Sequence, residues 1–372
     1  MKIGIDARMY GAESTTGIGV YIQKLTEKLF SIDEKNEYYL FLKEPAFSQF
    51  KPPTDRVKKI KTEIPWYNYS EQIKLPRLLN KYKLDLVHFP HFNVPIFYQG
   101  KFIVTIHDIT PKFFPGPKVK KSLLRRLAYN LVLNQALEKS KRIITVSQYT
   151  KNNLTKYFDI DSEKIEIIYP GIGEEFKKID SSFEEIIKKY NITKPFLFYI
   201  GVWRDHKNLP GLIKSFEILK SKYNQDYQLV LGGKPDPRYP EIQQAIEYSK
   251  FKNDIITPGF IPEDELPLFY NAAKLFVLSS FAEGFGLVAV ESLACGTPVV
   301  SSNTTSLPEV LKDSAIYFNP KDPLEIAKAI DQVLNDHNLY QNLITKGLIL
   351  AREYNWRSCA QKTLAVYQES IN

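Results

Sequence analysis

The sequence predicts an α/β protein made of two Rossmann-like, doubly wound domains. Its 372 residues suit two domains of ordinary size. Short apolar runs alternate with amphipathic stretches along the whole chain, a pattern typical of a parallel sheet covered by helices on both faces. The same series starts twice, near residue 2 and again near residue 196.

The predicted strands divide into two sets. Those of the first half are KIGIDA, YYLFLK, LVHF, KFIVTIH, RIITVS and KIEIIYPG, with a helix expected over residues 20–30. Those of the second half are FLFYIG, YQLVLGG, DIITPGF, KLFVLSS, TPVVSS and AIYF. A polar stretch over residues 173–194 separates the two sets. We therefore expect domains over 1–173 and 174–355, followed by a last helix over 356–372.

Composition restricts the partners and the location. The net charge of +8 and the pI of about 9.0 favour anionic partners. The two cysteines, Cys295 and Cys359, form neither a zinc motif nor a disulfide framework. Asp6 and Arg8 interrupt any signal-peptide core, and no apolar run approaches the ~20 residues of a membrane span. We expect a cytoplasmic protein that either stays free or lies on the inner face of the membrane.

The strongest motif runs over residues 279–302, where a strand, a glycine-containing turn and a helix follow one another. The turn contains Glu283, Gly284, Phe285 and Gly286, and the helix begins at Leu287 and carries Glu291. Amides at a helix N-terminus bind phosphate, whereas carboxylates accept hydrogen bonds from sugar hydroxyls. The pattern therefore predicts a ligand with phosphates in its middle and sugars at both ends. The alternative is a plain strand–turn–helix with surface glutamates.

A second motif over residues 199–213 is also a strand, a loop and a helix. Its loop carries two cations, Arg204 and Lys207. Two cations at the edge of a cleft would stabilise a departing diphosphate. The alternative is a solvated basic loop.

Two weaker motifs lie in the first half. Gly17 and Gly19 follow the first strand, but Ile22 stands where a dinucleotide fingerprint needs a third glycine. His107 and Asp108 end another strand, at the edge where open α/β sheets bind ligands. A simple turn and a packed histidine are the respective alternatives.

No metal site is expected. The Asp159-Ile160-Asp161 segment spells the DxD of metal-dependent sugar transferases. It falls in a polar turn away from the predicted strand ends, so we expect neither aspartate to bind a metal ion.

The stretch over residues 111–133 is basic and aromatic. Its cations are Lys112, Lys118, Lys120, Lys121, Arg125 and Arg126, interleaved with Phe113, Phe114, Leu123, Leu124 and Leu127. Two interpretations stay open: an anionic membrane surface as partner, or a helix whose apolar face packs on the sheet while its charges meet water. Nucleic acid is not expected, because no recognition motif accompanies the charge.

Together these segments resemble the retaining glycosyltransferases of family 4. The segments YIGVWRDHKNL, SSFAEGFGLVAVESL and SNTTSLPEV carry the resemblance in the second half, and GIGVYI, TIHD and TVSQYTKNNL support it in the first. The resemblance implies the GT-B fold: two domains facing each other across a cleft, with a C-terminal helix crossing back onto the N-terminal domain. It also implies that the first domain binds the acceptor and the second the donor.

The resemblance also implies residue roles. Glu291 would hold the ribose, Glu283 the transferred hexose, and Lys207 and Arg204 the diphosphate. The other implied donor contacts are His107 beside the hexose, Gly17 and Gly19 near the phosphates, Phe260 at the base, and the segment Gly284, Phe285, Gly286 and Leu287. Many relatives place the arginine directly after the strand glycine, whereas Val202 and Trp203 intervene here.

The predicted function is therefore metal-independent transfer of a hexose with retention of configuration. The donor is expected to be GDP-mannose, with a UDP-hexose as second choice and no cofactor. The acceptor would be a saccharide or a lipid-linked saccharide. The alternatives are a nucleotide-sugar epimerase with the same fold and a non-catalytic binder of nucleotide sugars. A nicotinamide-dependent oxidoreductase lacks its glycine pattern.

Overall fold

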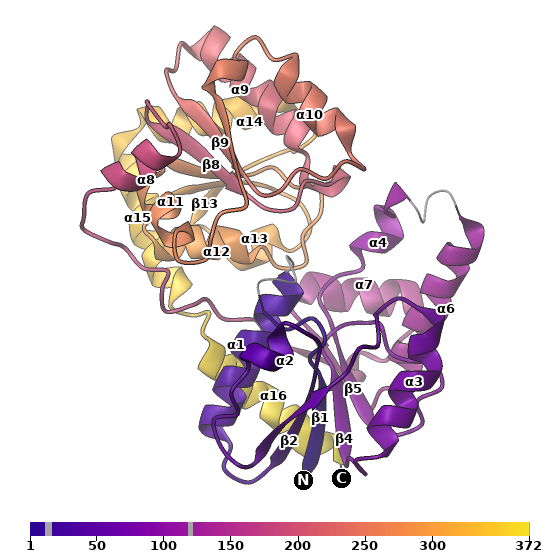
Figure 1. Cartoon of the computed structure of the whole chain (residues 1–372). Coiled ribbons are helices and arrows are strands. Elements are labelled where there is room, and N and C mark those ends of the chain that lie inside the picture. The colour runs from indigo at the N-terminus through magenta and orange to yellow at the C-terminus, as the bar shows by residue number, and fades with distance from the viewer. Residues whose placement is uncertain (12–16, 118–121, 372) are drawn as a thin grey trace. The chain divides into compact units, whose positions relative to one another are not determined.

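A computed structural model describes residues 1–11, 17–117 and 122–371 and divides the chain into two compact units (Figure 1). Unit 1 comprises Met1–Gly171 together with Asn355–Asn372, and unit 2 comprises Ile172–Tyr354. The observed boundaries follow residues 171 and 354. The boundaries predicted after residues 173 and 355 are therefore two residues and one residue too late.

Unit 1 contains a parallel sheet in the order β3-β2-β1-β4-β5-β6-β7. The strands are β1 (Lys2–Asp6), β2 (Glu37–Leu42), β3 (Val57–Lys61), β4 (Leu86–Phe89), β5 (Phe102–Ile106), β6 (Ile143–Thr145) and β7 (Ile165–Ile167). The direction in which the sheet grows reverses between β1 and β4. This switch point is where doubly wound sheets bind their ligands.

The described helices of unit 1 are α1 (Gly17–Ile32), α2 (Ala46–Gln49), α3 (Tyr69–Asn80), α4 (Thr110–Phe113), α6 (Leu123–Lys139), α7 (Gln148–Phe158) and α16 (Trp356–Ile371). The last of these, α16, lies beside α1 (Figure 1). Its Trp356 ring meets the edge of Tyr21 at 5.7 Å, and the Tyr367 hydroxyl lies 2.7 Å from Nδ1 of the buried His88. The predicted return of the C-terminal helix to the first domain is therefore confirmed.

Unit 2 repeats the architecture, with a parallel sheet in the order β10-β9-β8-β11-β12-β13. Its strands are β8 (Phe196–Ile200), β9 (Gln228–Gly232), β10 (Ile255–Gly259), β11 (Leu275–Leu278), β12 (Val299–Ser302) and β13 (Ala315–Phe318). Its helices are α8 (Glu184–Lys189), α9 (Leu209–Tyr223), α10 (Pro240–Glu247), α11 (Leu266–Ala272), α12 (Leu287–Ala294), α13 (Leu307–Leu311), α14 (Pro323–Asn335) and α15 (His337–Ala351). The two Rossmann-like domains that the sequence predicts are thus confirmed.

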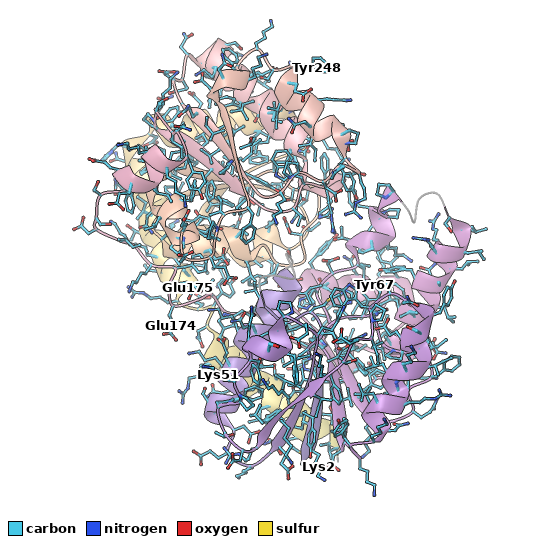
Figure 2. The ribbon with its side chains drawn as sticks, viewed as in Figure 1. Lys2, Lys51, Tyr67, Glu174, Glu175 and Tyr248 are labelled. Atoms are coloured by element: carbon cyan, nitrogen blue, oxygen red, sulfur yellow. The ribbon has the colours of Figure 1, made fainter. Side chains whose placement is uncertain are left out.

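Aromatic rings hold the two central strands of unit 2 against α11. Phe198 of β8 stacks on Phe269 at 5.4 Å and meets Phe276 of β11 at 5.9 Å. Tyr270 closes the cluster, 5.4 Å from Phe198 and 5.5 Å from Phe276. Side chains fill the space between the helices and the sheet in both units (Figure 2). The strands that carry the candidate site are therefore held by a close-packed core.

Two details differ from the sequence prediction. Strand β3 was not predicted, because its sequence VKKIK contains three lysines. Lysine is common on the outermost strand of a sheet, where it discourages pairing with other chains, and β3 is such an edge strand. Helix α1 starts at Gly17 rather than at residue 20. No helix within the described ranges has both the length and the apolar character that a membrane span requires.

Candidate active site

The switch point of unit 2 lies between β8 and β11, which are neighbours in the sheet. The loop after β8 contains Lys207, in a short 3-10 helix over Asp205–Lys207. The loop after β11 contains Glu283. Parallel strands end at the same edge of a sheet, so the topology brings together two residues that are 76 positions apart.

Lys207 and Glu283 form a shielded ion pair. The ammonium donates to both carboxylate oxygens, at 2.7 Å to Oε1 and 2.8 Å to Oε2. The two side chains are only 15% and 10% exposed. The hydroxyl of Ser280 donates a further hydrogen bond of 2.7 Å to Oε1. A carboxylate offers about four acceptor positions, so these three bonds leave one on Oε2 for a ligand hydroxyl.

Burial and charge act in opposite directions on Glu283. Burial alone would raise the pKa of its carboxyl, whereas the charge of Lys207 and the hydrogen bonds from Lys207 and Ser280 lower it. The attraction prevails, and the pKa of Glu283 lies below its ordinary value. Burial and the charge of Lys207 also lower the pKa of His206 to about 4. At neutral pH the site therefore holds a carboxylate, an ammonium and an uncharged imidazole.

Hydroxyl side chains fix the backbone of both loops. Thr305 accepts a hydrogen bond of 3.1 Å from the Glu283 N–H, and Ser306 donates one of 3.0 Å to the Glu283 carbonyl. Ser279 donates one of 3.0 Å to the carbonyl of Lys207. These bonds hold the pair in place before any ligand arrives, as electrostatic preorganisation requires.

Helix α12 begins directly after the Glu283 loop. Its N-cap, Gly286, has a φ of +93°, and a Cβ there would come within 2.7 Å of the Leu307 side chain. Only glycine suits both conditions. The Ala289 N–H donates to the Gly286 carbonyl at 2.9 Å, whereas the N–H groups of Leu287 and Val288 have no acceptor inside the helix, and the helix dipole makes this end partly positive. The end of α12 can therefore bind phosphate beside Lys207.

The other predicted donor contacts on this segment are well packed. Glu291 accepts a hydrogen bond of 2.9 Å from Tyr270, the tyrosine of the aromatic core. Gly284 is buried, and the buried Phe285 ring meets Tyr354 edge-on at 5.3 Å. The Glu291 carboxylate is therefore oriented from behind by a side chain of the core.

Arg204 and Phe260 lie at the surface of unit 2. The side chain of Arg204 is exposed, because the preceding Trp203 turns into the protein and donates to the Gly232 carbonyl at 3.4 Å. Trp203, one of the two residues that precede Arg204 here, thus anchors the loop. Phe260 follows β10, and the Lys234 ammonium lies 5.2 Å from the centre of its exposed ring.

The remaining predicted residues, His107, Gly17 and Gly19, belong to unit 1. Nε2 of His107 lies 2.9 Å from the carbonyl oxygen of Pro90, so this nitrogen carries the proton. Burial lowers the pKa of His107, which leaves Nδ1 of the neutral ring as an acceptor. Gly17 opens α1, and a Cβ there would meet no atom within 4 Å. Contacts with the part of the chain that the structure describes therefore do not require glycine at this position.

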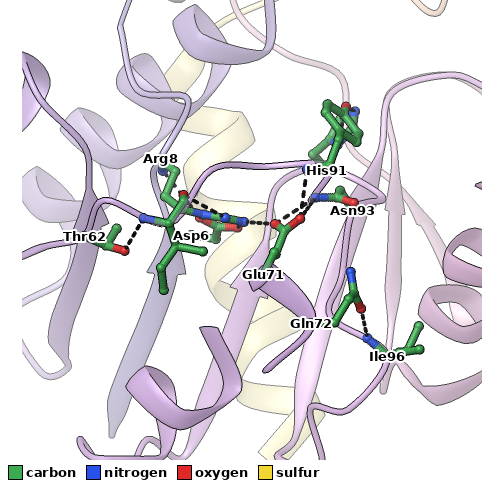
Figure 3. A network of polar contacts seen from close by, with 10 residues as sticks. Asp6, Arg8, Thr62, Glu71, Gln72, His91, Asn93 and Ile96 are labelled. Atoms are coloured by element: carbon green, nitrogen blue, oxygen red, sulfur yellow. Dashed lines mark hydrogen bonds and ion pairs between the residues drawn. The ribbon is translucent and has the colours of Figure 1, made fainter. Parts of the chain in front are cut away.

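A buried ion network that was not predicted from the sequence lies at the switch point of unit 1, where β1 and β4 end (Figure 3). Arg8, after β1, donates to Asp6 at 2.7 Å and contacts Glu71 of α3 in a second ion pair. Asn93 donates to both Glu71 oxygens at 2.8 and 2.7 Å. Burial raises the pKa of Glu71 against the opposing effect of Arg8. The network ties α3 to the ends of β1 and β4.

Arg8 also forms part of the wall of a cavity of about 630 Å³ in unit 1. This cavity is bounded by the β1–α1 loop, α1 and the β2–α2 segment. Its walls include Tyr10, Phe50 and Trp66 together with the polar side chains of Gln23, Glu27 and Lys43. A cavity of this size, whose walls combine aromatic rings with polar and charged side chains, is a candidate small-molecule site.

The aspartates of the DxD segment have structural roles. Asp159 ends α7 with a φ of +51°, and Asp161 caps the next 3-10 helix by accepting from the Glu163 N–H at 2.9 Å. Among the residues that the structure describes, no group of three His, Cys, Asp or Glu side chains is arranged to hold a metal ion.

Comparison with known families agrees with this geometry. The family model described as glycosyl transferases group 1 matches residues 182–348, and that of Glycosyltransferase Family 4 matches residues 16–176. The two models together match most of both units. The chain belongs to glycosyltransferase family 4.

Relatives of this glycosyltransferase include mannosyltransferases of Escherichia coli. O-antigen chain mannosyltransferase B of Escherichia coli is 29% identical over 78% of this chain and 76% of its own length. The serotype-specific mannosyltransferase WbdA of the same organism is 31% identical over 74% of this chain. The chain spans only 34% of WbdA, about a third of that longer protein.

Solved structures share the two-domain fold. Sucrose-phosphate synthase from Thermosynechococcus elongatus has a TM-score of 0.80 and 20% identity, covering 99% of this chain and 98% of its own. HepE from Anabaena, solved with UDP and glucose, has a TM-score of 0.78 and 17% identity, covering 99% of this chain and 100% of its own. The fold of this glycosyltransferase is therefore GT-B.

The charged residues of the unit 2 site were predicted from the sequence, but the residues that position them were not. Ser280, Thr305 and Ser306 hold Glu283, and Tyr270 holds Glu291. A usable signal was present, because the hydroxyl residues follow β11 and β12 at the same edge of the sheet.

The ion pair makes a pH-dependent contribution to stability. In the native protein the lowered pKa of Glu283 contributes stability above pH 4.5, and this contribution is lost as the pH falls through the lowered value. Replacing Lys207 by Met leaves burial unopposed, so the pKa of Glu283 should rise above its ordinary value. We expect Lys207→Met to lower the free energy of unfolding by roughly 2–4 kcal/mol at pH 7 and by less at pH 5.

Urea unfolding of Lys207→Met at several pH values measures this effect. Adding Glu283→Gln should restore much of the loss, because no unpaired charge then remains. The control is Lys214→Met, which removes an exposed lysine paired with Glu217 and should cost less than about 1 kcal/mol. A loss that does not change with pH would contradict the assignment of Glu283 as the buried charge.

Proposed function

We propose that this glycosyltransferase moves a hexose from a nucleoside diphosphate sugar to a saccharide acceptor, with retention of configuration. The single observation that carries the proposal is the Lys207–Glu283 pair, set beside the N-terminus of α12 at the switch point of unit 2. This arrangement offers a cation and helix amides for a pyrophosphate, and a carboxylate for the hydroxyls of the adjoining sugar.

The proposed reaction forms one bond and breaks one. An acceptor hydroxyl attacks the anomeric carbon from the face that the diphosphate leaves, and the carbon–oxygen bond to the phosphate breaks. The acceptor proton passes to the departing phosphate oxygen, so no protein nucleophile is required. Lys207, helped by Arg204, neutralises the charge that grows on the diphosphate. Neutral His107, through Nδ1, accepts a hydrogen bond from a hexose hydroxyl.

We assign GDP-mannose as the donor, with a UDP-hexose as second choice. Both Escherichia coli relatives are named mannosyltransferases, and this favours mannose. The HepE structure contains UDP and glucose, and this keeps the uridine donor in consideration. In either case Glu291, oriented by Tyr270, holds the ribose hydroxyls of the nucleotide.

We assign the acceptor saccharide, free or lipid-linked, to the cavity of unit 1. Its volume of about 630 Å³ lies within the usual range for small-molecule sites. The rings of Tyr10 and Trp66 supply apolar surface, while Gln23 and Glu27 supply hydrogen-bonding groups. The free, buried thiols of Cys295 and Cys359 suit the reducing environment of a cytoplasmic enzyme.

Substitutions at the ion pair test the proposed activity. Lys207→Ala should lower the turnover number by about 10²–10³, the usual cost of removing one preorganised donor, and Glu283→Ala should lower it as well. The measurement is the rate of sugar transfer to a saccharide acceptor at saturating donor. Lys214→Ala, which removes an exposed lysine of α9, is the matched control and should transfer at the wild-type rate.

The same assay separates the rival functions. With donor alone a transferase forms no glycoside, whereas an epimerase converts the donor. A wild-type protein that binds nucleotide sugar but transfers it to none of a broad set of acceptors would favour a non-catalytic binder. Unchanged rates in both Lys207→Ala and Glu283→Ala would refute the site assignment.

Thermal unfolding with a panel of nucleotide sugars tests the donor. At a concentration 100 times its dissociation constant, the true donor should stabilise the protein by about 2.7 kcal/mol. We expect GDP-mannose to raise the melting temperature more than UDP-glucose or ADP-glucose at equal concentration. A larger rise with UDP-glucose would contradict GDP-mannose and favour a UDP-hexose as the donor.

A further inference from the structure

Helix α6 of unit 1 has a core-facing stripe near its C-terminal end. Leu133, Ala136 and Leu137 are buried and belong to the hydrophobic core around β4 and β5. Tyr129 and Val132 pack against the same core from the preceding turn. A surface helix of a globular protein packs on the core through one apolar stripe, and these residues form that stripe of α6.

The same helix carries a second apolar stripe that faces away from the core. Leu123, Leu124, Leu127 and Leu131 are 73%, 77%, 55% and 52% exposed. At about 100° per residue they fall within roughly 100° of arc, on the side of α6 opposite the core-facing stripe. The N-terminal turns of α6 project beyond the sheet (Figure 1). We call these four residues the leucine stripe; packing within unit 1 does not account for them.

Cations surround the leucine stripe. From residue 111 to residue 137 the sequence contains no acidic side chain. Arg125 and Arg126 are exposed on the turns that carry the stripe. Lys112 and Arg126 line a hollow of about 180 Å³ beside this end of α6. Lys118, Lys120 and Lys121 lie outside the described residues.

The charges decide between two occupants of the stripe. At about 100° per residue Arg125 and Arg126 flank the leucine stripe, so a second copy packed stripe against stripe would gain no opposite charge from this helix. Four leucines also offer far less than the roughly 1,600 Å² of a standard protein interface. An anionic lipid surface supplies what both features need, because its acyl boundary accepts the leucines and its headgroups neutralise the cations.

We propose that the leucine stripe of α6 enters the interface of an anionic phospholipid membrane, with Arg125, Arg126 and Lys112 at the level of the headgroups. Of the two interpretations of the basic stretch, the structure favours this one, because the residues that pack on the sheet are not the exposed leucines. The proposal concerns unit 1 alone and stands independently of the donor site. With unit 1 bound in this way, the enzyme would meet a lipid-linked acceptor at the membrane surface.

Flotation of the full-length protein with lipid vesicles tests the proposal. We expect strong binding to vesicles of 30% phosphatidylglycerol in phosphatidylcholine, weak binding to pure phosphatidylcholine, and weaker binding to the anionic vesicles at 0.5 M NaCl. Leu124→Ser and Leu127→Ser should each lower the partition coefficient by about tenfold or more. Arg125→Gln with Arg126→Gln should lower it by about 25-fold on anionic vesicles only.

Ile349→Ser is the matched control, since Ile349 is an exposed aliphatic residue of unit 2 and its loss should leave flotation unchanged. Donor-induced thermal stabilisation of the leucine variants reports folding, and thus separates a failed membrane proposal from a failed donor site. Equal flotation of the wild type and the Leu124→Ser/Leu127→Ser protein would overturn the proposal. So would a dimer in sedimentation velocity that the same substitutions convert to a monomer.

Discussion

The ion pair between Lys207 and Glu283 is the interaction on which the candidate site of unit 2 depends. Its two residues come from loops far apart in the sequence and meet because β8 and β11 are neighbours at the switch point. An unpaired charge at this depth would be costly, whereas a hydrogen-bonded pair is tolerated. Lysine has three N–H donors, and two of them point to Glu283. The third donor and the remaining acceptor position on Oε2 are left for a ligand.

Unit 1 also has a switch point in its parallel sheet, but the charged groups there are arranged differently. Its switch point between β1 and β4 is closed by the buried network of Arg8, Asp6 and Glu71, whose charges are satisfied within the protein. An aromatic cavity lies beside this network, and the leucine stripe of α6 lies on the outer surface. Unit 2 thus carries an ion pair with free hydrogen-bonding positions at its switch point, while unit 1 satisfies its buried charges internally and has a cavity walled by aromatic, polar and charged side chains.

Alternating apolar runs were sufficient to predict the two sheets, because buried parallel strands are nearly continuous in hydrophobic residues. Strand β3 was not predicted because its lysines interrupt the apolar run. Lysines are tolerated there because the strand lies at the edge of the sheet and is only half buried. Lys207 and Glu283 could be named from local patterns, but their contact could not, since it depends on strand order. Ser280 and Thr305 have no characteristic spacing, and their place after β11 and β12 was the signal that could have identified them. The Arg8 network was missed because isolated charges carry no spacing signal. The leucine stripe needed the structure to show which face of α6 packs on the core.

The most direct test of the central claim is calorimetric titration of the Glu283→Gln protein with GDP-mannose and with GDP. If Glu283 holds the hexose while Lys207 holds the diphosphate, Glu283→Gln should weaken binding of the sugar nucleotide and leave binding of GDP nearly unchanged. Lys207→Gln should weaken the binding of both ligands. Equal weakening of GDP and GDP-mannose by Glu283→Gln, or no effect of either substitution, would contradict the account.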